Sequence, residues 1–282
     1  MCKLSIVTIN YNNAGGLQKT IESVNSQTFK DVEYIIVDGC STDASVEVIK
    51  KYKDHLTYWV SEKDKGIYHA MNKGINIARG EYLLMLNSGD VFTSNVILEN
   101  VFTGRVIEAD IIYADVLWNI NGKNKEERHP DKLTFQYFRH NFLCHQSVFI
   151  RRLLHHSVGM YDERLKIIAD WKFEILAMCK YNATYLHVPL FSVQCEWGGL
   201  SKRPESWEIV LAERKQTLEQ EFPGFLPDYL AQDKIQRELE DLNKTLYIRV
   251  RRRLSKIFQN MLNPENNRGK RALLNPGKAN LL

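Results

Sequence analysis

The chain of 282 residues contains few cysteines and no long apolar segment. Its five cysteines, at positions 2, 40, 144, 179 and 195, include no Cys-x-x-Cys pair, which argues against a disulfide framework or a zinc cage. No window approaches the roughly 18 apolar residues that a membrane-spanning helix needs. The apolar stretch after Met1, Cys2 and Lys3 is too short for a secretory signal. We therefore expect a protein of the reducing cytosol.

The dinucleotide-binding fingerprint Gly-x-Gly-x-x-Gly is also absent, because Ala14, Gly15 and Gly16 follow a predicted strand without that spacing. The sequence instead repeats an order of apolar strand, polar turn and amphipathic helix. Strands are predicted at residues 4–9, 34–37, 58–60 and 82–86, and helices at residues 17–26, 46–50 and 69–78. This order favours a parallel sheet with right-handed crossovers, whose loops gather polar side chains at one edge.

The segment EYLLMLNSGD, residues 81–90, is the first candidate site. Its apolar run Tyr82–Leu86 suits a strand buried on both faces of a parallel sheet. Asp90 then lies at the edge where open α/β folds bind ligands, and its carboxylate can bind a metal ion. The structural alternative is that Asp90 caps a helix beginning near Thr93 or Asn95, and this segment alone does not decide between the two.

The middle of the chain predicts further elements. We expect a helix at residues 95–106, a strand at 110–117, a polar turn at 121–125, and helices at 171–179 and 207–221, the last followed by a break at 222–227. Pro189 places the strands of residues 183–193 at a sheet edge. The aromatic residues of segment 135–142 are interpreted as core or interdomain packing rather than as a ligand-binding platform; they are Phe135, Tyr137, Phe138 and Phe142.

Charge is unevenly distributed along the chain. From Lys244 onward ten Lys or Arg stand against one acidic residue, whereas the preceding part carries 28 basic and 33 acidic residues. In the predicted helix of residues 234–262, apolar positions recur at helical spacing and basic residues cover the rest. Such a helix fits an anionic inner-leaflet surface, where each basic residue contributes ~1 kcal/mol. Nucleic acid would attract the same charge, and packing on the body or on a second subunit is a further alternative.

Four segments together resemble the N-terminal half of family 2 glycosyltransferases of GT-A fold. They are VDGCSTD at residues 37–43, SEKDKGIYHAMNKGI at 61–75, Ala78–Gly80 and LNSGD at 86–90. Each segment is weak alone, but their order and spacing match jointly. The resemblance covers roughly the first 200 residues. It is greatest to the branch that builds bacterial capsule, exopolysaccharide and O-antigen repeat units.

The resemblance implies an α/β fold of GT-A type, with a Rossmann-like, mostly parallel sheet flanked by helices. Residues 1–205 would form the GT-A domain, with a nucleotide-sugar-binding half at 1–110 and an acceptor-binding half at 111–205. Residues 206–262 would form a basic helical extension and residues 263–282 a disordered tail. The lipid-linked acceptors common in this branch favour the membrane, rather than nucleic acid, as the partner of the extension.

The resemblance also implies a nucleotide-diphosphate sugar donor of UDP or GDP type, whose departing diphosphate needs a cation. The family binds Mg²⁺ or Mn²⁺ through an Asp-x-Asp motif, and only Asp90 keeps a carboxylate here, so we expect the ion on Asp90, donor phosphates and water. Further contacts to the base, ribose and start of the diphosphate are expected from Thr8, Asn10, Tyr11, Asp38, Asp64, Lys65, Gly66, Tyr68, Asn87, Ser88 and Gly89. His69 stands where the family often has Asp.

The segment GMYDERLKIIADW, residues 159–171, is similar to the family's Gly-x-x-Asp-Glu segment that precedes an acidic general base. The match is Asp170, preceded by Ala169 where the family often has Glu. Inverting transfer needs a carboxylate that takes the proton of the acceptor hydroxyl. The alternative is that Asp170 only caps the following helix. Trp171 either stacks on an acceptor sugar or packs in the core.

Gly198, Gly199 and Ser201 resemble the family's mobile Gly-Gly-x-Ser loop, which closes over donor phosphates. Lys202 and the following arginine are interpreted as a solvated pair rather than as phosphate ligands. His145 is a candidate contact to phosphate or acceptor, with a structural histidine as the alternative.

These expectations define an inverting, metal-dependent hexosyltransferase that transfers a sugar to a saccharide acceptor, lipid-linked in many relatives, in cell-surface polysaccharide synthesis. Such an enzyme would work in the cytoplasm or at the inner face of the plasma membrane. A sugar-nucleotide nucleotidyltransferase is the alternative enzyme, although the early Gly-rich loop with Arg that such enzymes usually show is absent. A non-catalytic saccharide- or membrane-binding relative stays open because the motif retains a single acidic residue.

Overall fold

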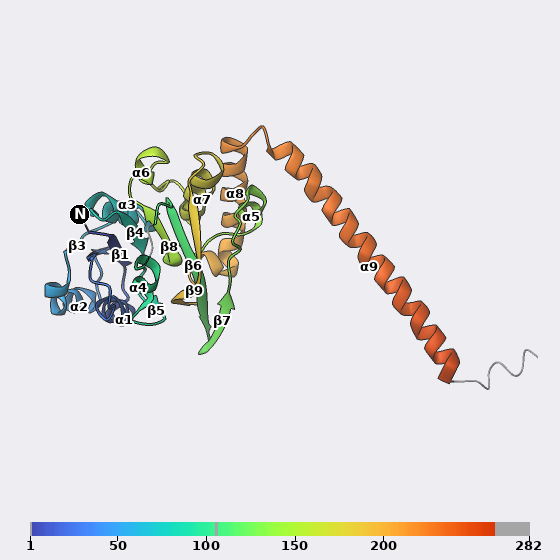
Figure 1. Ribbon diagram of the computed structural model, residues 1–282, viewed down its shortest axis with the longest axis horizontal. Coiled ribbons are helices and arrows are strands. Elements are labelled where there is room, and N and C mark those ends of the chain that lie inside the picture. The colour runs from blue at the N-terminus through green and yellow to red at the C-terminus, as the bar shows by residue number, and fades with distance from the viewer. Residues whose placement is uncertain (1, 105–106, 263–282) are drawn as a thin grey trace, which may run out of the picture. The chain divides into compact units, whose positions relative to one another are not determined.

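The computed structural model describes residues 2–104 and 107–262 (Figure 1). The chain divides into two compact units, Met1–Glu221 and Phe222–Leu282. The first unit is a nine-stranded sheet flanked by helices, with the order β3-β2-β1-β4-β8-β6-β9-β5 and β7 paired to β6.

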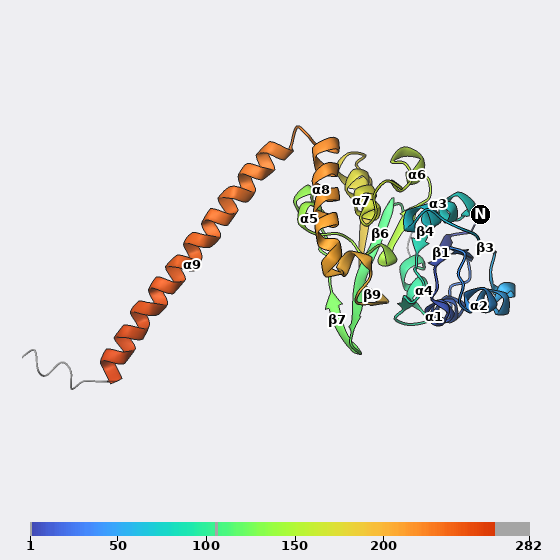
Figure 2. The ribbon, with the colours of Figure 1, turned by 180° about the vertical axis from the view of Figure 1, so that it is seen from behind.

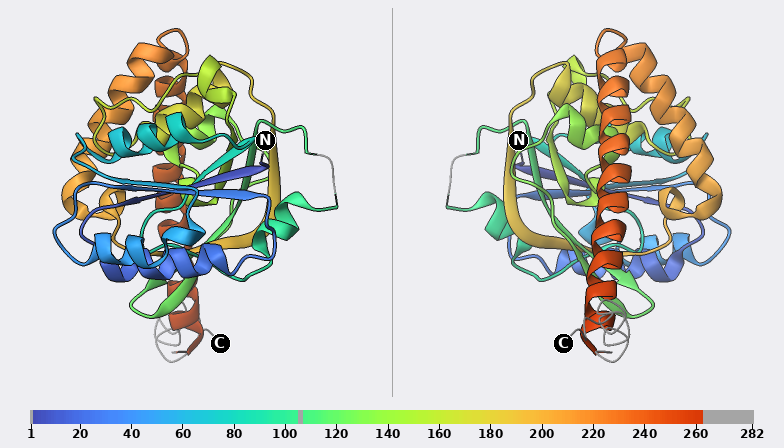
Figure 3. Two further views of the ribbon diagram at one scale, coloured as in Figure 1. Left: turned by 90° about the vertical axis from the view of Figure 1, so that its left-hand side faces the viewer. Right: turned by 90° about the vertical axis from the view of Figure 1, so that its right-hand side faces the viewer.

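The N-terminal half of the sheet is parallel, as the repeated order of strand and helix predicts. Its strands are β1 (Leu4–Asn10), β2 (Val32–Asp38), β3 (Tyr58–Ser61) and β4 (Tyr82–Met85). The helices α1 (Ala14–Asn25) and α2 (Ser45–Lys51) cover one face, and α3 (Ile67–Ile77) covers the other (Figure 3). Gly74 lets α3 approach β1 closely, because a Cβ atom there would lie 2.3 Å from Val7 Cγ1.

Beyond β4 the sheet becomes mixed. Strand β8 (Val148–Arg151) runs antiparallel to β4 and to β6 (Ile111–Ile120). Strand β9 (Tyr185–Glu196) is parallel to β6, and the short β5 (Val91–Phe92) is antiparallel to β9. The predicted parallel order therefore holds for the N-terminal half, and antiparallel strands build the second half onto it.

Two local expectations are wrong, and one holds in part. Strand β9 lies between β6 and β5, but β5 pairs only with Val193 and Gln194, so the segment around Pro189 pairs with β6 alone, at a register shift between Val188 and Phe191. The predicted turn at residues 121–125 is shorter, since β7 (Lys123–Glu127) begins directly after Asn121 and Gly122, which have positive φ values of 52° and 80°. The helix expected at 95–106 is only α4 (Ile97–Phe102), and residues 105–106 lie outside the described part.

The remaining helices of the first unit gather on the second half of the sheet. Helix α7 (Ala169–Cys179) contacts α5 (Phe135–His140) and α8 (Trp207–Glu221) (Figure 2). Shorter elements are α6 (Leu154–Ser157) and the 3-10 turns η1 (Lys53–His55), η2 (His145–Ser147), η3 (Leu200–Lys202) and η4 (Pro204–Ser206).

The second unit contains the helix α9 (Leu226–Leu262), so the expected helical extension is present. Its apolar side chains are exposed, with Leu246, Leu254 and Phe258 between 59% and 65% accessible. Within the described residues, none of the helices is both long and apolar enough to span a membrane. The tail of residues 263–282, expected to be disordered, lies outside the described part of the chain.

Candidate active site

The carboxyl ends of β1, β2 and the segment after β4 meet through one asparagine. The Asn10 Nδ2 group donates to Asp38 Oδ1 at 2.7 Å, and the Ser88 hydroxyl donates to Asn10 Oδ1 at 2.8 Å. The parallel sheet thus brings together three of the residues that the sequence assigned to the donor, as expected for ligand sites at this edge.

Two residues that the sequence assigned to the donor, Thr8 and Asp38, are buried beneath the sheet edge and do not line the main pocket. Thr8 is wholly buried and shares a hydrogen bond of 3.0 Å with the Tyr34 hydroxyl. Asp38 is also wholly buried, and its carboxylate already accepts bonds from Asn10, Ser41 and Ser61. Burial raises the pKa of Asp38, but these hydrogen bonds outweigh it, and the net pKa is lowered. In this conformation both side chains hold the strand ends together.

A second group of predicted donor residues lies near the end of β2. Tyr11 is 68% exposed, and a Cβ atom on Gly39 would lie 3.3 Å from the Tyr11 ring and 2.6 Å from Asp64 Oδ2. The Asp64 carboxylate accepts the Gly66 N–H at 2.9 Å, and Lys65 N–H donates to a ring nitrogen of His69 at 3.3 Å. This group adjoins the strand ends but does not line the main pocket.

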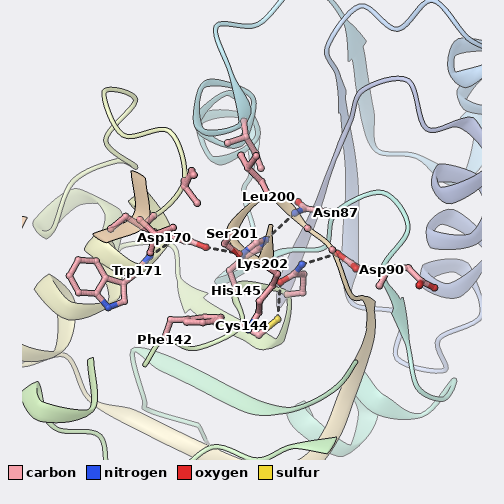
Figure 4. A pocket seen from close by; sticks show the side chains of 18 of the residues that line it. Asn87, Asp90, Phe142, Cys144, His145, Asp170, Trp171, Leu200, Ser201 and Lys202 are labelled. Carbon is pink, nitrogen blue, oxygen red and sulfur yellow. Dashed lines mark hydrogen bonds and ion pairs between the residues drawn. The ribbon is translucent and has the colours of Figure 1, made fainter. Parts of the chain in front are cut away.

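The main pocket has a volume of about 510 Å³ and lies in the first unit (Figure 4). Its lining contains both carboxylates that the sequence singles out, Asp90 and Asp170. The other predicted site residues on its walls are Tyr68, Asn87, Ser88, Gly89, His145, Trp171, Gly198, Gly199 and Ser201. The donor motif, the candidate base and the Gly-Gly-x-Ser loop therefore share one cavity.

Asp90 is a pocket residue and not a helix cap, because α4 begins at Ile97 after Val96, without a side-chain cap bond. Its side chain is 8% exposed and accepts Gln146 Nε2–H at 2.9 Å. Burial raises the pKa of Asp90 to about 6, although the Gln146 bond lowers it. A cation would stabilise this buried carboxylate.

Asn87 lies three residues before Asp90 in the chain and lines the same pocket, so its amide oxygen is a second candidate metal ligand. Its Oδ1 atom is buried and has no hydrogen-bond partner among the described residues. The same residues contain no cluster of three His, Cys, Asp or Glu able to hold a metal ion alone. One carboxylate and one amide oxygen fit a hard divalent cation that takes its other ligands from phosphate and water.

Asp170 lies in the first turn of α7, whose N-cap residue is Ile168, so the capping alternative does not describe it. Its Oδ1 atom accepts the Tyr68 hydroxyl at 3.0 Å and Trp171 N–H at 2.9 Å, and Oδ2 lies 2.9 Å from His145 Nδ1. Burial raises the pKa of Asp170, but the His145 contact and the other donors outweigh it, and the net pKa is lowered. Asp170 is therefore a carboxylate at neutral pH, 19% exposed to the pocket.

Two consecutive residues of η2 hold the two carboxylates. His145 contacts Asp170, while Gln146 donates to Asp90, and Figure 4 shows His145 between the two acidic residues. The other ring nitrogen, His145 Nε2, lies 3.0 Å from Asn87 Nδ2. This geometry assigns a proton to Nδ1, which donates to Asp170, and leaves Nε2 to accept from the Asn87 amide. The turn thus fixes both carboxylates relative to each other.

The interpretation of Lys202 as solvated is wrong. Its Nζ atom lies over the rings of Phe142, Trp118 and Trp197, at 4.3, 4.9 and 4.9 Å from their centroids. Burial lowers the pKa of Lys202. These cation–π contacts connect the Gly-Gly-x-Ser loop to the pocket wall, and only Phe142 among the three rings belongs to the predicted aromatic run.

Trp171 is a core residue, so of its two alternatives core packing describes it and stacking on a sugar does not. The side chain is 2% exposed, and its indole N–H donates to Phe138 O at 2.7 Å. The Arg214 guanidinium lies 5.1 Å from the ring centroid. Sequence reasoning missed Arg214 and Gln146, because neither stands in a recognisable segment.

A twisted α/β sheet with a donor motif after β4 and a facing carboxylate on α7 defines a glycosyltransferase of GT-A fold. The family model described as Glycosyl transferase family 2 matches residues 5–155. The chain belongs to this family and is a glycosyltransferase.

Relatives agree with this assignment. A PGL/p-HBAD biosynthesis glycosyltransferase of Mycobacterium bovis is 33% identical over 206 residues, which cover 70% of this chain and 78% of that protein. An uncharacterized glycosyltransferase of Methanocaldococcus jannaschii is 27% identical, over 61% of this chain and 63% of that protein.

Solved structures share the fold at low identity. Residues 1–349 of S. aureus TarS align with a TM-score of 0.60 and 18% identity, covering 77% of this chain and 65% of that one. The mannosyltransferase PcManGT of Pyrobaculum calidifontis, in complex with GDP-Man and Mn²⁺, aligns with a TM-score of 0.55 and 15% identity, covering 78% of this chain and 64% of that one. This chain thus spans somewhat less than two thirds of each of these two structures.

Proposed function

We propose that the protein is an inverting, metal-dependent glycosyltransferase that moves one sugar from a nucleotide-diphosphate donor to a saccharide acceptor. The observation that carries this proposal is the η2 turn, whose His145 and Gln146 bind Asp170 and Asp90 on the walls of one pocket. Single-displacement transfer requires a base beside the nucleophile and a positive charge beside the leaving diphosphate, and a carboxylate on the donor side can hold the cation that supplies this charge.

On the acceptor side, Asp170 is the proposed general base. The acceptor hydroxyl oxygen bonds to the anomeric carbon as the bond from that carbon to the diphosphate oxygen breaks, and the hydroxyl proton passes to Asp170. The nucleoside diphosphate leaves with the bonding electrons. His145 and Tyr68 hold the Asp170 carboxylate in place through bonds of 2.9 and 3.0 Å, so its orientation is set before the acceptor binds.

On the donor side, Asp90 and the Asn87 amide oxygen are the proposed protein ligands of Mg²⁺ or Mn²⁺. When bound, such an ion neutralises charge on the departing diphosphate. Lys202, which lines the same pocket without a carboxylate partner among the described residues, adds a second positive charge close by. The Mn²⁺ complex of the mannosyltransferase PcManGT supports this assignment.

The donor class rests on relatives of the same fold. TarS structures are known with UDP and with UDP-GlcNAc, and the PcManGT structure contains GDP-Man. We therefore propose a UDP- or GDP-sugar as donor, with Tyr11, Asp64 and Gly66 next to the nucleoside. The mycobacterial relative is named a PGL/p-HBAD biosynthesis glycosyltransferase, which supports a role in a biosynthetic pathway. We propose that the acceptor here is a saccharide, lipid-linked in some cases, in cell-surface polysaccharide synthesis.

Nucleotide release tests this function. Purified protein is incubated with UDP- and GDP-sugars and Mn²⁺, and free UDP or GDP is measured, with Asp90→Ala as the inactive control. We expect release that depends on the metal ion and is lost in Asp90→Ala. Pyrophosphate release from a sugar phosphate and a nucleoside triphosphate would instead identify a nucleotidyltransferase, and no release from any donor would favour a non-catalytic binding protein.

The basic helix α9 is the proposed contact to the membrane, which would place the enzyme in the cytoplasm at the inner face of the plasma membrane. Exposed apolar side chains such as Val250 and Ile257 alternate with Arg251, Arg252 and Arg253 along it. We expect the full chain to sediment with anionic vesicles at low salt and a chain truncated after Asn243 to remain in solution. Sedimentation unchanged by truncation would contradict this location.

A further inference from the structure

Arg214 on α8 is a guanidinium on the pocket wall that forms no ion pair with any of the described residues. It lies 5.1 Å from the centroid of the Trp171 ring and donates from Nη2 to Asn141 O at 3.4 Å. Its Nε atom is buried and has no hydrogen-bond partner among the described residues. The cation–π contact holds the guanidinium against the Trp171 ring, while its Nε–H lacks an acceptor.

The described residues place no carboxylate within ion-pair distance of Arg214. By contrast, the next residue, Lys215, is 76% exposed and lies 3.9 Å from the Glu219 carboxylate. Burial lowers the pKa of Arg214, and the Asp170 carboxylate raises it. Asp170 is not its ion-pair partner, because the two side chains do not come within ion-pair distance, and the Asp170 carboxylate is bound by His145, Tyr68 and Trp171 N–H. A half-buried guanidinium without an ion pair is partly desolvated, so a counter-charge supplied by a ligand would stabilise it.

The position of Arg214 indicates which substrate supplies that charge. Arg214 and Asp170 line the same pocket, and the ring of Trp171, next to Asp170 in the chain, packs against the guanidinium. On the proposed function, this side of the pocket receives the acceptor. The N–H groups of an arginine form a planar fork that fits a carboxylate or a phosphate with two parallel bonds.

We propose that Arg214 binds an anionic group of the acceptor, so that the acceptor is an acidic saccharide carrying a carboxylate or a phosphate. This inference rests on the proposed function, because it takes the Asp170 side of the pocket as the acceptor side. The anionic group orients the acceptor by its contact to Arg214, and the hydroxyl that reacts lies within reach of Asp170.

Matched acceptor probes test the inference. Methyl glucuronide, glucose 1-phosphate and the neutral methyl glucoside are compared by calorimetric titration and, with donor present, by kcat/KM. The wild-type protein is expected to prefer at least one charged probe over the neutral one by about tenfold or more, as charge-assisted bonds imply. Preference for the glucuronide assigns a carboxylate, and preference for the sugar phosphate assigns a phosphate.

Variants separate recognition of charge from a general defect. Arg214→Gln should bring the ratio of kcat/KM for the charged acceptor to kcat/KM for the neutral acceptor close to one. Arg214→Lys should retain part of the preference for the charged acceptor. The exposed control Lys215→Gln should show the same ratio as the wild type. An equal preference in wild type and Arg214→Gln, or no preference in the wild type, would overturn the inference. Absence of nucleotide release from every donor would refute the proposed function instead. The affinities of charged and neutral probes, measured by calorimetry, would still show whether Arg214 recognises the charge.

Discussion

Replacing His145 by alanine should lower kcat by about 10- to 100-fold and leave the KM for the donor within about threefold. The change removes the Nδ1–H that contacts Asp170 Oδ2 at 2.9 Å and the ring nitrogen that lies 3.0 Å from Asn87 Nδ2. A hydrogen bond to a charged group contributes about 1.5–3 kcal/mol. If that contribution is expressed in the transition state, each 1.36 kcal/mol corresponds to a tenfold change in rate.

Initial rates of nucleotide release, with donor and acceptor varied separately, provide the assay. Asp170→Asn alone, His145→Ala alone and the double variant form a thermodynamic cycle. Because the two side chains are in contact, we expect the kcat of the double variant to lie within about threefold of the kcat of Asp170→Asn. His55→Ala is the control, because this exposed histidine on η1 contacts neither carboxylate.

Two results would refute the reasoning: a kcat of His145→Ala equal to that of the wild type, or losses that multiply in the double variant. An unchanged kcat would show that the contact between His145 and Asp170 has no effect on the base. The second would show that His145 acts independently of Asp170.

Three further predictions concern stability and the loop. Gly74→Ala should lower the urea midpoint, because its Cβ would lie 2.3 Å from Val7 Cγ1 and overpacking costs about 1–3 kcal/mol. Burial lowers the pKa of His155 to about 4, below its value in the unfolded chain. The free energy of unfolding should therefore fall by about 3 kcal/mol between pH 7 and pH 4, because the unfolded chain takes up the proton first. The variant His155→Phe should lack this loss in acid unfolding. Lys202→Gln removes three cation–π contacts and should speed hydrogen exchange in residues 198–202.

The parallel half of the fold was predictable because its strands β1, β2 and β4 are buried on both faces and leave contiguous apolar runs such as Tyr82–Leu86. Strand β7 was not predictable in this way. Its sequence KNKEE is mostly exposed and contains no apolar residue, so only the pairing with β6 makes it a strand. Pro189 correctly indicated an open edge at its own position, but it could not show that the C-terminal end of β9 pairs with β5.

The site shows a similar division. Asp90 and Asp170 each follow a recognisable segment, so the sequence could name both. Their partners come from elsewhere in the chain: Gln146 and His145 reach them from a turn that carries no strong pattern, and Arg214 comes from α8. Such contacts depend on how distant elements pack, which residue spacing does not encode. The burial of Asp38 behind the strand ends also became visible only in three dimensions.

The most direct test of the two carboxylates' separate roles uses the variants Asp90→Ala and Asp170→Asn. For each variant, binding of UDP and GDP in the presence of Mn²⁺ is measured by calorimetric titration, and turnover is measured alongside. We predict that Asp170→Asn binds the nucleotide as the wild type does and loses transfer by about 10²–10⁴-fold, the usual contribution of a general base. Asp90→Ala should lose the metal-dependent part of binding. Ordinary turnover in Asp170→Asn, or Mn²⁺-dependent binding that survives in Asp90→Ala, would contradict the account.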